Sequence, residues 1–180
     1  MTTAATRMSN TQFAKFMERI HVLHTQCFEL GKKVYHTSDK TNINANISKA
    51  VVCINKAFQK ATNHDGFYVE AIMMFALGYA NAKYGVSVDF SVELDTRIKA
   101  DVKVGNHAYQ LKLGKQVFEK SYIETLRRNN VELLVVRTYN QRSMYGKTLD
   151  EAFVSMLAKA DVKVNDQVLV SKLHDLWTYL

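Results

Sequence analysis

Apolar side chains repeat at helical spacing through the first third of the chain. Ser9 and Gln12 have the spacing of a capping box, and the apolar residues behind them predict one long amphipathic helix that ends near Gly31. Its apolar stripe consists of Phe13, Phe16, Met17, Ile20, Leu23, Cys27 and Leu30. A second helix is expected from Ile47 to Ala61 and a third from Phe67 to Lys83.

The apolar period changes from that of a helix to that of a strand after residue 85. Five apolar residues then alternate with polar ones, which predicts a strand with one buried face. They are Val86, Val88, Phe90, Val92 and Leu94. Two more strands, 100–104 and 107–113, flank Gly105-Asn106, where glycine supplies the positive φ of a two-residue hairpin turn.

The second half of the chain completes an α/β pattern. A helix is expected from about Val117 to Asn130, and VELLVVRTY (131–139) is typical of a central strand covered on both faces. Thr148 and Asp166 are expected to cap two final helices. The order α-β-β-β-α-β, with extra N-terminal and C-terminal helices, predicts a mixed central sheet flanked by helices.

Positive charge is concentrated in the first third of the chain. Residues 1–62 hold nine Lys and Arg against three acids, a net +6, whereas residues 63–180 hold fifteen against fourteen, a net +1. We expect a basic helical region over 1–62 and a core over 63–180, joined in one compact domain. A basic face suits a polyanion such as nucleic acid, but a solvated, lysine-rich helix surface explains the same charge equally well.

Composition narrows the class of protein. Hydrophobic residues make up 47% of the 180 residues, which is typical of a folded protein. No apolar run is long enough to span a bilayer and the start lacks the apolar stretch of a secretory signal, so we expect no membrane partner. The two cysteines, Cys27 and Cys53, do not make a disulfide framework, which indicates reduced thiols in an intracellular, cytoplasmic protein.

The expected hairpin separates apolar from polar side chains, because opposed residues point to the same side of a sheet. One face carries the apolar residues Val102, Val104, Tyr109, Leu111 and Leu113. The other face carries Asp101, Lys103, Gln110 and Lys112. Carboxylate and amide oxygens suit Mg²⁺ or Mn²⁺, and a neighbouring lysine can orient a bound water. An ordinary amphipathic hairpin with solvated polar residues is the other interpretation.

Glu70 is the only charged residue in FYVEAIMMFALGYANA, residues 67–82. So apolar a helix must be buried along most of its length, and an unpaired buried carboxylate costs several kcal/mol. Glu70 is therefore expected to be neutral, paired or metal-bound. The other interpretation places it near solvent in the first turn of the helix, where the helix dipole favours a negative charge.

The order of these residues resembles the PD-(D/E)xK nuclease superfamily, which has a restriction-endonuclease-like fold. In that family a helical Glu, a strand Asp and an (E/Q)xK tripeptide surround one or two divalent metals, within an α-β-β-β-α-β core that matches residues 66–139. The resemblance looks closest to the Mrr-like and Holliday-junction-resolvase-like branches. It implies that Glu70, Asp101 and Gln110 hold Mg²⁺ or Mn²⁺ and act in catalysis. It also implies that Lys112 positions the attacking water.

The function that this resemblance implies is a metal-dependent DNA endonuclease, and many members of the family act as homodimers. Ala100 stands where the family often has Pro. Gln110 has no charge, so the same fold could instead be a catalytically inactive module that binds nucleic acid or protein. RNA is not excluded as the substrate.

Several basic residues are candidates for phosphate contacts. We expect Lys115, Arg127 and Arg128 to contact phosphates near the site, and Lys32 and Lys33 to contribute to a basic surface on the N-terminal helices. Such contacts fix position on a duplex but carry little sequence information.

Other polar residues have two interpretations each. Glu93 and Asp95 are either additional ligands or solvated side chains on the polar face of the first strand. His21, His24 and Cys27 recur every three residues, but zinc needs a fourth ligand and none is spaced to supply it. The string KADVKV occurs at 99–104 and again at 159–164. Only the first copy is followed by QLK, so we assign a site to that copy alone.

Overall fold

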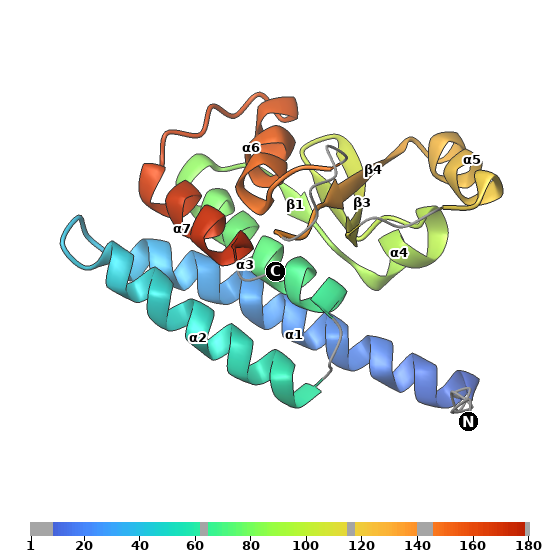
Figure 1. Ribbon diagram of the computed structural model, residues 1–180, viewed down its shortest axis with the longest axis horizontal. Coiled ribbons are helices and arrows are strands. Elements are labelled where there is room, and N and C mark those ends of the chain that lie inside the picture. Colours follow the sequence, from blue (N-terminus) through green and yellow to red (C-terminus); the bar gives the residue numbers. More distant parts are fainter. Residues whose placement is uncertain (1–8, 62–64, 115–117, 140–145, 179–180) are drawn as a thin grey trace.

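The computed structural model describes residues 9–61, 65–114, 118–139 and 146–178. These residues form a mixed α/β structure of seven helices and one four-stranded sheet (Figure 1). In chain order the elements are α1 (Asn10–Thr37), α2 (Ile43–Ala61), α3 (Asp65–Tyr84), β1 (Val88–Asp89), α4 (Val92–Ile98), β2 (Val102–Val104), β3 (His107–Leu113), α5 (Lys120–Arg128), β4 (Val131–Val136), α6 (Leu149–Lys159) and α7 (Gln167–Trp177).

The first helix begins as expected and ends later than expected. Ser9 and Gln12 form the predicted capping box, but α1 continues past Gly31 to Thr37. Gly31 lies inside the helix, where the absence of a side chain allows a close contact with another helix. A Cβ on Gly31 would lie 2.0 Å from the Phe75 carbonyl oxygen of α3, and a Cβ on Gly78 would lie 2.0 Å from the Phe28 carbonyl oxygen of α1. The two glycines let the backbones of α1 and α3 touch.

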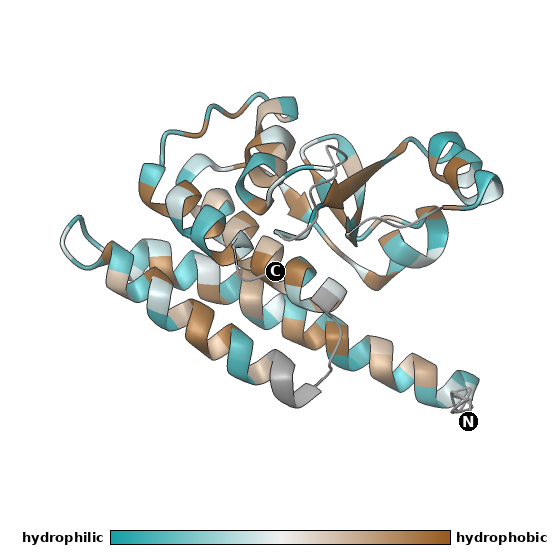
Figure 2. Ribbon diagram, in the orientation of Figure 1, coloured by the Kyte–Doolittle hydropathy of each residue, from teal (hydrophilic) through white to brown (hydrophobic). Residues whose placement is uncertain are grey.

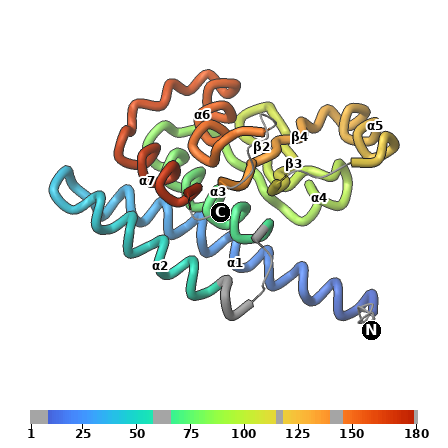
Figure 3. Tube along the Cα trace, in the orientation of Figure 1, coloured from blue at the N-terminus to red at the C-terminus, as the bar shows by residue number. Residues whose placement is uncertain are grey.

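Helix α3 is the centre of the core, as its composition predicts. Every residue from 69 to 80 is buried. Helices α1 and α2 run antiparallel beside α3, α6 lies between α3 and the sheet, and α7 packs against α6 and α2 (Figure 3). One apolar cluster contains buried side chains from all five of these helices and from the sheet.

The sheet confirms the hairpin and its register. Its strand order is β1-β2-β3-β4, with the first three strands antiparallel and β4 parallel to β3. Val102 pairs with Tyr109, and Val104 with His107. Gly105 has a φ of 58° at the turn, a conformation that glycine adopts without steric cost. Val102 and Tyr109 are buried, as the apolar face requires.

The strand β4 is at the edge of the sheet, so the prediction of a central strand was wrong. In the described residues, its outer side makes only one isolated bridge, between Val136 and Lys147. The run is apolar because helices cover both of its faces. Val131 packs with Leu126 of α5, and Leu134 belongs to the main core. Figure 2 shows most of β4 as hydrophobic.

The expected strand over residues 86–95 is cut short, because its second half begins a helix. Only Val88–Asp89 pairs as a strand, and α4 begins at Val92. The Ser91 hydroxyl accepts a hydrogen bond from the Leu94 N–H at 3.3 Å, which caps the helix. Glu93 forms an ion pair with Arg97 one turn later, at 2.7 Å. These local helix signals override the alternating pattern, and they move residues 92–98 out of the sheet.

The last three helices form in the places where the sequence predicts helices. Helix α5 spans Lys120–Arg128, which is within the expected range. The first residue of that range, 117, is not among the described residues. Thr148 caps α6 with a full capping box, and Asp166 caps α7. Both KADVKV copies follow a helix, but only the first continues into a strand.

Candidate functional site

Asp101 and Gln110 contact each other at the open end of the hairpin, away from its turn. One carboxylate oxygen of Asp101, Oδ2, accepts hydrogen bonds from the Gln110 side-chain amide and from the Leu111 backbone N–H, each at 2.6 Å. The backbone N–H of Asp101 donates to the Tyr109 carbonyl oxygen at 2.8 Å. Main chain and side chain together therefore fix Asp101 against β3, with Oδ1 outside these contacts.

Glu70 lies in the second turn of α3 and is buried, with 9% of its surface exposed. The interpretation that it sits near solvent in the first turn is therefore wrong. Burial raises the pKa of Glu70 well above its usual value, and the negative charge of Asp101 raises it further, while the positive charge of Lys112 lowers it. The carboxylates of Glu70 and Asp101 are thus electrostatic neighbours in a poorly solvated place.

Lys112 lies two residues after Gln110 on β3 and is half-buried. Burial raises the pKa of Asp101 to about 6, and the Lys112 charge and the hydrogen bonds from Leu111 and Gln110 oppose that rise. Because Lys112 also acts on Glu70, the structure brings Glu70, Asp101, Gln110 and Lys112 into one neighbourhood. They come from α3, from the residue just before β2 and from β3.

Asp95 joins this cluster from the unexpected helix α4. Its charge raises the pKa of both Glu70 and Asp101, whereas Glu93 points to solvent and pairs with Arg97. The Ser91 cap followed by two acidic residues is the sequence signal for this helix start. Tyr122 of α5 is a residue that the sequence does not single out. Burial raises its pKa, and the charges of Asp101 and Asp95 raise it further.

His24 of α1 is the neighbour of Glu70 on the other side. Its Nε2 atom lies 3.6 Å from Oε2 of Glu70, and the ring hydrogen-bonds to the Phe67 backbone. Burial, and then the charge of His21, lower the pKa of His24 to about 4, so its ring is neutral at neutral pH. Burial raises the pKa of Cys27 to about 12, which disfavours the thiolate that zinc binding requires.

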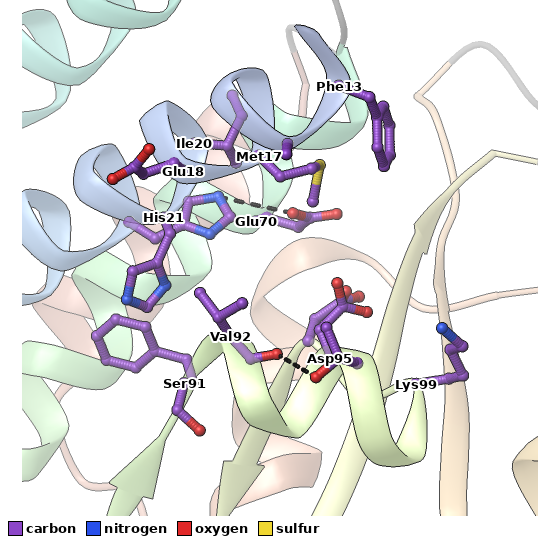
Figure 4. Close-up of a pocket in the computed structure, with 15 residues that line it drawn as sticks. Phe13, Met17, Glu18, Ile20, His21, Glu70, Ser91, Val92, Asp95 and Lys99 are labelled. Carbon is purple, nitrogen blue, oxygen red and sulfur yellow. Dashed lines mark hydrogen bonds and ion pairs between the residues drawn. The ribbon is translucent and has the colours of Figure 1, made fainter. Parts of the chain in front are cut away.

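A pocket of about 730 Å³ opens beside the carboxylates. Its walls come from the N-terminal half of α1 and from α4, and Glu70, Asp95 and Asp101 are among the residues that line it. Figure 4 shows Glu70 pointing into this space, with Met17 of α1 beside it and Asp95 of α4 on the opposite wall. Lys99, just after α4, lies at the margin.

The expected phosphate contacts are spread over the molecule. Arg127 and Arg128 are exposed in the last turn of α5. Lys32 is paired with Glu29 at 3.2 Å, and it follows His24 by eight residues, or about 12 Å along the helix. The structure therefore does not bring Lys32 and the adjacent Lys33 to the pocket.

Lys115 lies outside the described residues. Lys99 is the lysine that lines the pocket in the described part of the chain, and sequence reasoning did not select it.

Metal ligands are not preassembled in the described ranges. No group of three or more His, Cys, Asp or Glu side chains there is arranged to hold a metal ion. Gln110 is the neutral member of the cluster, and its side-chain N–H is already hydrogen-bonded to Asp101. No helix among the described residues is long and apolar enough to cross a membrane.

Comparisons with known proteins return no relative. No protein-family model matches the chain, and neither a curated protein nor a solved structure matches it.

Proposed function

We propose that the protein is a metal-dependent endonuclease that hydrolyses phosphodiester bonds in DNA, with a core of the restriction-endonuclease-like kind. The observation that carries this proposal is the contact between Asp101 and Gln110, with Glu70 and Lys112 in the same poorly solvated neighbourhood. The sheet supports it, because three antiparallel strands, a helix and a fourth, parallel strand follow α3 in the expected order. Helix α4 is an insertion into that order.

The donor chemistry fits a hard divalent cation. Glu70 and Asp101 offer carboxylate oxygens and Gln110 an amide oxygen, which are the ligands that Mg²⁺ and Mn²⁺ take. Burial beside like charges raises the pKa of both acids, and a cation would relieve that repulsion. Bound there, Mg²⁺ or Mn²⁺ would polarise a phosphate oxygen and lower the pKa of a water molecule.

The chain's own residues have separate roles in this proposal. Gln110 and the Leu111 N–H hold the Asp101 carboxylate in place. Lys112 orients the attacking water and offsets negative charge on the phosphate. His24 lies against Glu70 and limits the positions that its carboxylate can take.

Cleavage of plasmid DNA with Mg²⁺ or Mn²⁺ tests the proposal. We expect Asp101→Ala and Lys112→Ala each to abolish nicking or cutting. Lys103→Ala is the matched control, since it removes a lysine from the same hairpin, at the residue paired with Ala108. Activity that persists in both Asp101→Ala and Lys112→Ala would show that the site is wrongly assigned.

A second candidate function is binding without catalysis. The neutral Gln110 and the lack of a preassembled metal group in the described residues favour it. Calorimetry with Mn²⁺ separates the two, because the endonuclease must bind Mn²⁺ in a manner that depends on Glu70 and Asp101. Parallel assays with RNA identify the nucleic acid. Sedimentation of the protein with and without DNA tests whether it forms the homodimer that the family resemblance implies.

A further inference from the structure

We propose that the pocket between α1 and α4 receives a nucleobase that has left its base stack, and that the substrate is therefore DNA with an unpaired or readily extruded base. The proposal rests on the proposed function, because it takes the phosphate beside that base as the one held at Glu70 and Asp101. Both of these residues also line the pocket, so the pocket and the proposed site share one wall.

The walls of the pocket suit the faces of a flat aromatic ring. Met17 and Ile20 line it from α1 and Val92 from α4, and the rings of Phe13, His21 and Phe90 are also part of the lining. The His21 and Phe90 rings contact each other, with centroids 5.9 Å apart and planes tilted by 46°. Bases stack on such side chains whatever their sequence, because every base has an aromatic face.

Two exposed apolar residues lie at this pocket. Phe13 is 55% exposed and Val92 is 52% exposed. They stand on facing walls, since Phe13 is on α1 and Val92 on α4. Exposed apolar side chains on two sides of a concave space indicate a place that is covered when a ligand binds.

The polar groups of the pocket suit the edge of a base and its phosphates. Asp95 is half-buried in the lining, and a carboxylate can accept hydrogen bonds from the amino and ring N–H groups of a base. Lys99 supplies a positive charge at the margin, where the strand must enter. Enzymes that extrude a base read it in this way, with apolar stacking on the faces and hydrogen bonds at the edge.

The size of the pocket is consistent with such a ligand. At about 730 Å³, it lies in the range of roughly 300–1,000 Å³ that is usual for small-molecule pockets. A base in this space, with its sugar at the opening, keeps the adjoining phosphate near the carboxylates.

Two tryptophan substitutions on the same helix test the proposal. Ala14 is exposed and lines the pocket, so Ala14→Trp fills it without entering the core. Val22 is 49% exposed on α1 and is not part of the lining, so Val22→Trp is the matched control. Val92→Trp blocks the pocket from the opposite wall and serves as a second variant if Ala14→Trp does not fold.

The measurement compares two DNA duplexes of one sequence, one fully paired and one with a single unpaired base. Affinity is measured with Ca²⁺, which takes the same oxygen ligands as Mg²⁺. We expect the unmodified protein and Val22→Trp to bind the duplex with the unpaired base about tenfold more tightly. In Ala14→Trp that preference should disappear while affinity for the paired duplex stays unchanged.

Each other result has a definite meaning. The base pocket is overturned if the unmodified protein binds both duplexes equally. It is also overturned if Ala14→Trp and Val92→Trp keep the full preference. In either case the proposed endonuclease stands if plasmid is still cut. Failure to bind or cut either duplex overturns the proposed function together with the pocket. If a free deoxynucleoside monophosphate binds as tightly as the duplex with the unpaired base, the ligand of the pocket is a free nucleotide and the proposal of a base within a DNA strand is wrong.

Discussion

The side-chain amide of Gln110 donates a hydrogen bond of 2.6 Å to the carboxylate of Asp101. In the arrangement that the sequence resembles, an acidic residue often stands at this position, and two carboxylates at this distance repel each other unless a cation lies between them. The amide replaces that repulsion with a hydrogen bond. In the proposed metal site, this pair would link metal binding to stability, and substitutions at either residue test that link.

Gln110→Glu should make the protein depend on a divalent cation for its stability. Without metal at pH 8, we expect the free energy of unfolding to fall by about 1–3 kcal/mol, because a hydrogen bond becomes a contact between like charges. With Mn²⁺ the variant should recover that loss and bind Mn²⁺ more tightly than the unmodified protein does. Urea denaturation with EDTA or with Mn²⁺ measures both effects. Equal Mn²⁺ affinity in the two proteins would remove Gln110 from the proposed ligands.

The pH dependence of stability gives a second prediction. Burial raises the pKa of Asp101 from 3.8 to about 6 in the folded protein. The folded state then holds this proton more tightly than the unfolded chain, so the contribution of Asp101 to stability is largest below about pH 4 and is lost as the pH rises from 4 to 6. The difference of about two pKa units corresponds to about 3 kcal/mol.

Asp101→Asn removes this titration and keeps an acceptor for Gln110. We therefore expect the variant to be up to about 3 kcal/mol more stable than the unmodified protein at pH 8, with little difference at pH 4. Urea denaturation in EDTA at the two pH values checks this, with the exposed Asp161→Asn as control. An advantage of Asp101→Asn that is the same at both values would show that Asp101 does not titrate as described.

The contact between α1 and α3 gives a third prediction, which concerns the fold alone. Gly78→Ala places a Cβ about 2.0 Å from the Phe28 carbonyl oxygen, so the helices must move apart. We expect a loss of at least about 2 kcal/mol in the free energy of unfolding. Gly66→Ala is the control on the same helix, because nothing lies within 4 Å of its added Cβ. It should be neutral or stabilising by up to about 1 kcal/mol. Similar losses in the two variants would contradict the close crossing.

The hairpin was predictable because its signals are local. Gly105-Asn106 fixes the turn, the turn fixes the register, and the register brings Asp101 to Gln110. The burial of Glu70 was also predictable, since no other charge interrupts the apolar helix around it.

Two parts of the site were not predicted from the sequence, the helix α4 and the pocket beside it. The alternation over residues 86–95 fits a strand, but the Ser91 cap and the Glu93–Arg97 pair stabilise a helix there. The pocket forms because this helix lies beside the first turns of α1, about eighty residues earlier in the chain. No local pattern encodes that approach, so neither the pocket nor the position of Asp95 could be read from the sequence.

Lys99 provides the last prediction, which separates backbone strain from charge. It ends α4 in the left-handed conformation, with a φ of 62°, which costs a residue with a side chain roughly 1–2 kcal/mol. Lys99→Gly and Lys99→Ala both remove the charge at the pocket margin, but only glycine adopts this φ freely. We expect Lys99→Gly to be about 1 kcal/mol more stable than Lys99→Ala. Both should bind DNA more weakly than the unmodified protein, and by the same factor.

Thermal denaturation and DNA-binding titrations at two salt concentrations measure these effects separately. If Lys99 contacts a phosphate, each variant should also show a smaller dependence of affinity on salt, because one fewer counterion is released on binding. Lys163→Ala, which removes an exposed lysine from the second KADVKV copy, is the matched control and should leave both quantities unchanged. If both Lys99 variants bind DNA with unchanged affinity and salt dependence, this lysine ends α4 but does not contact DNA at the pocket.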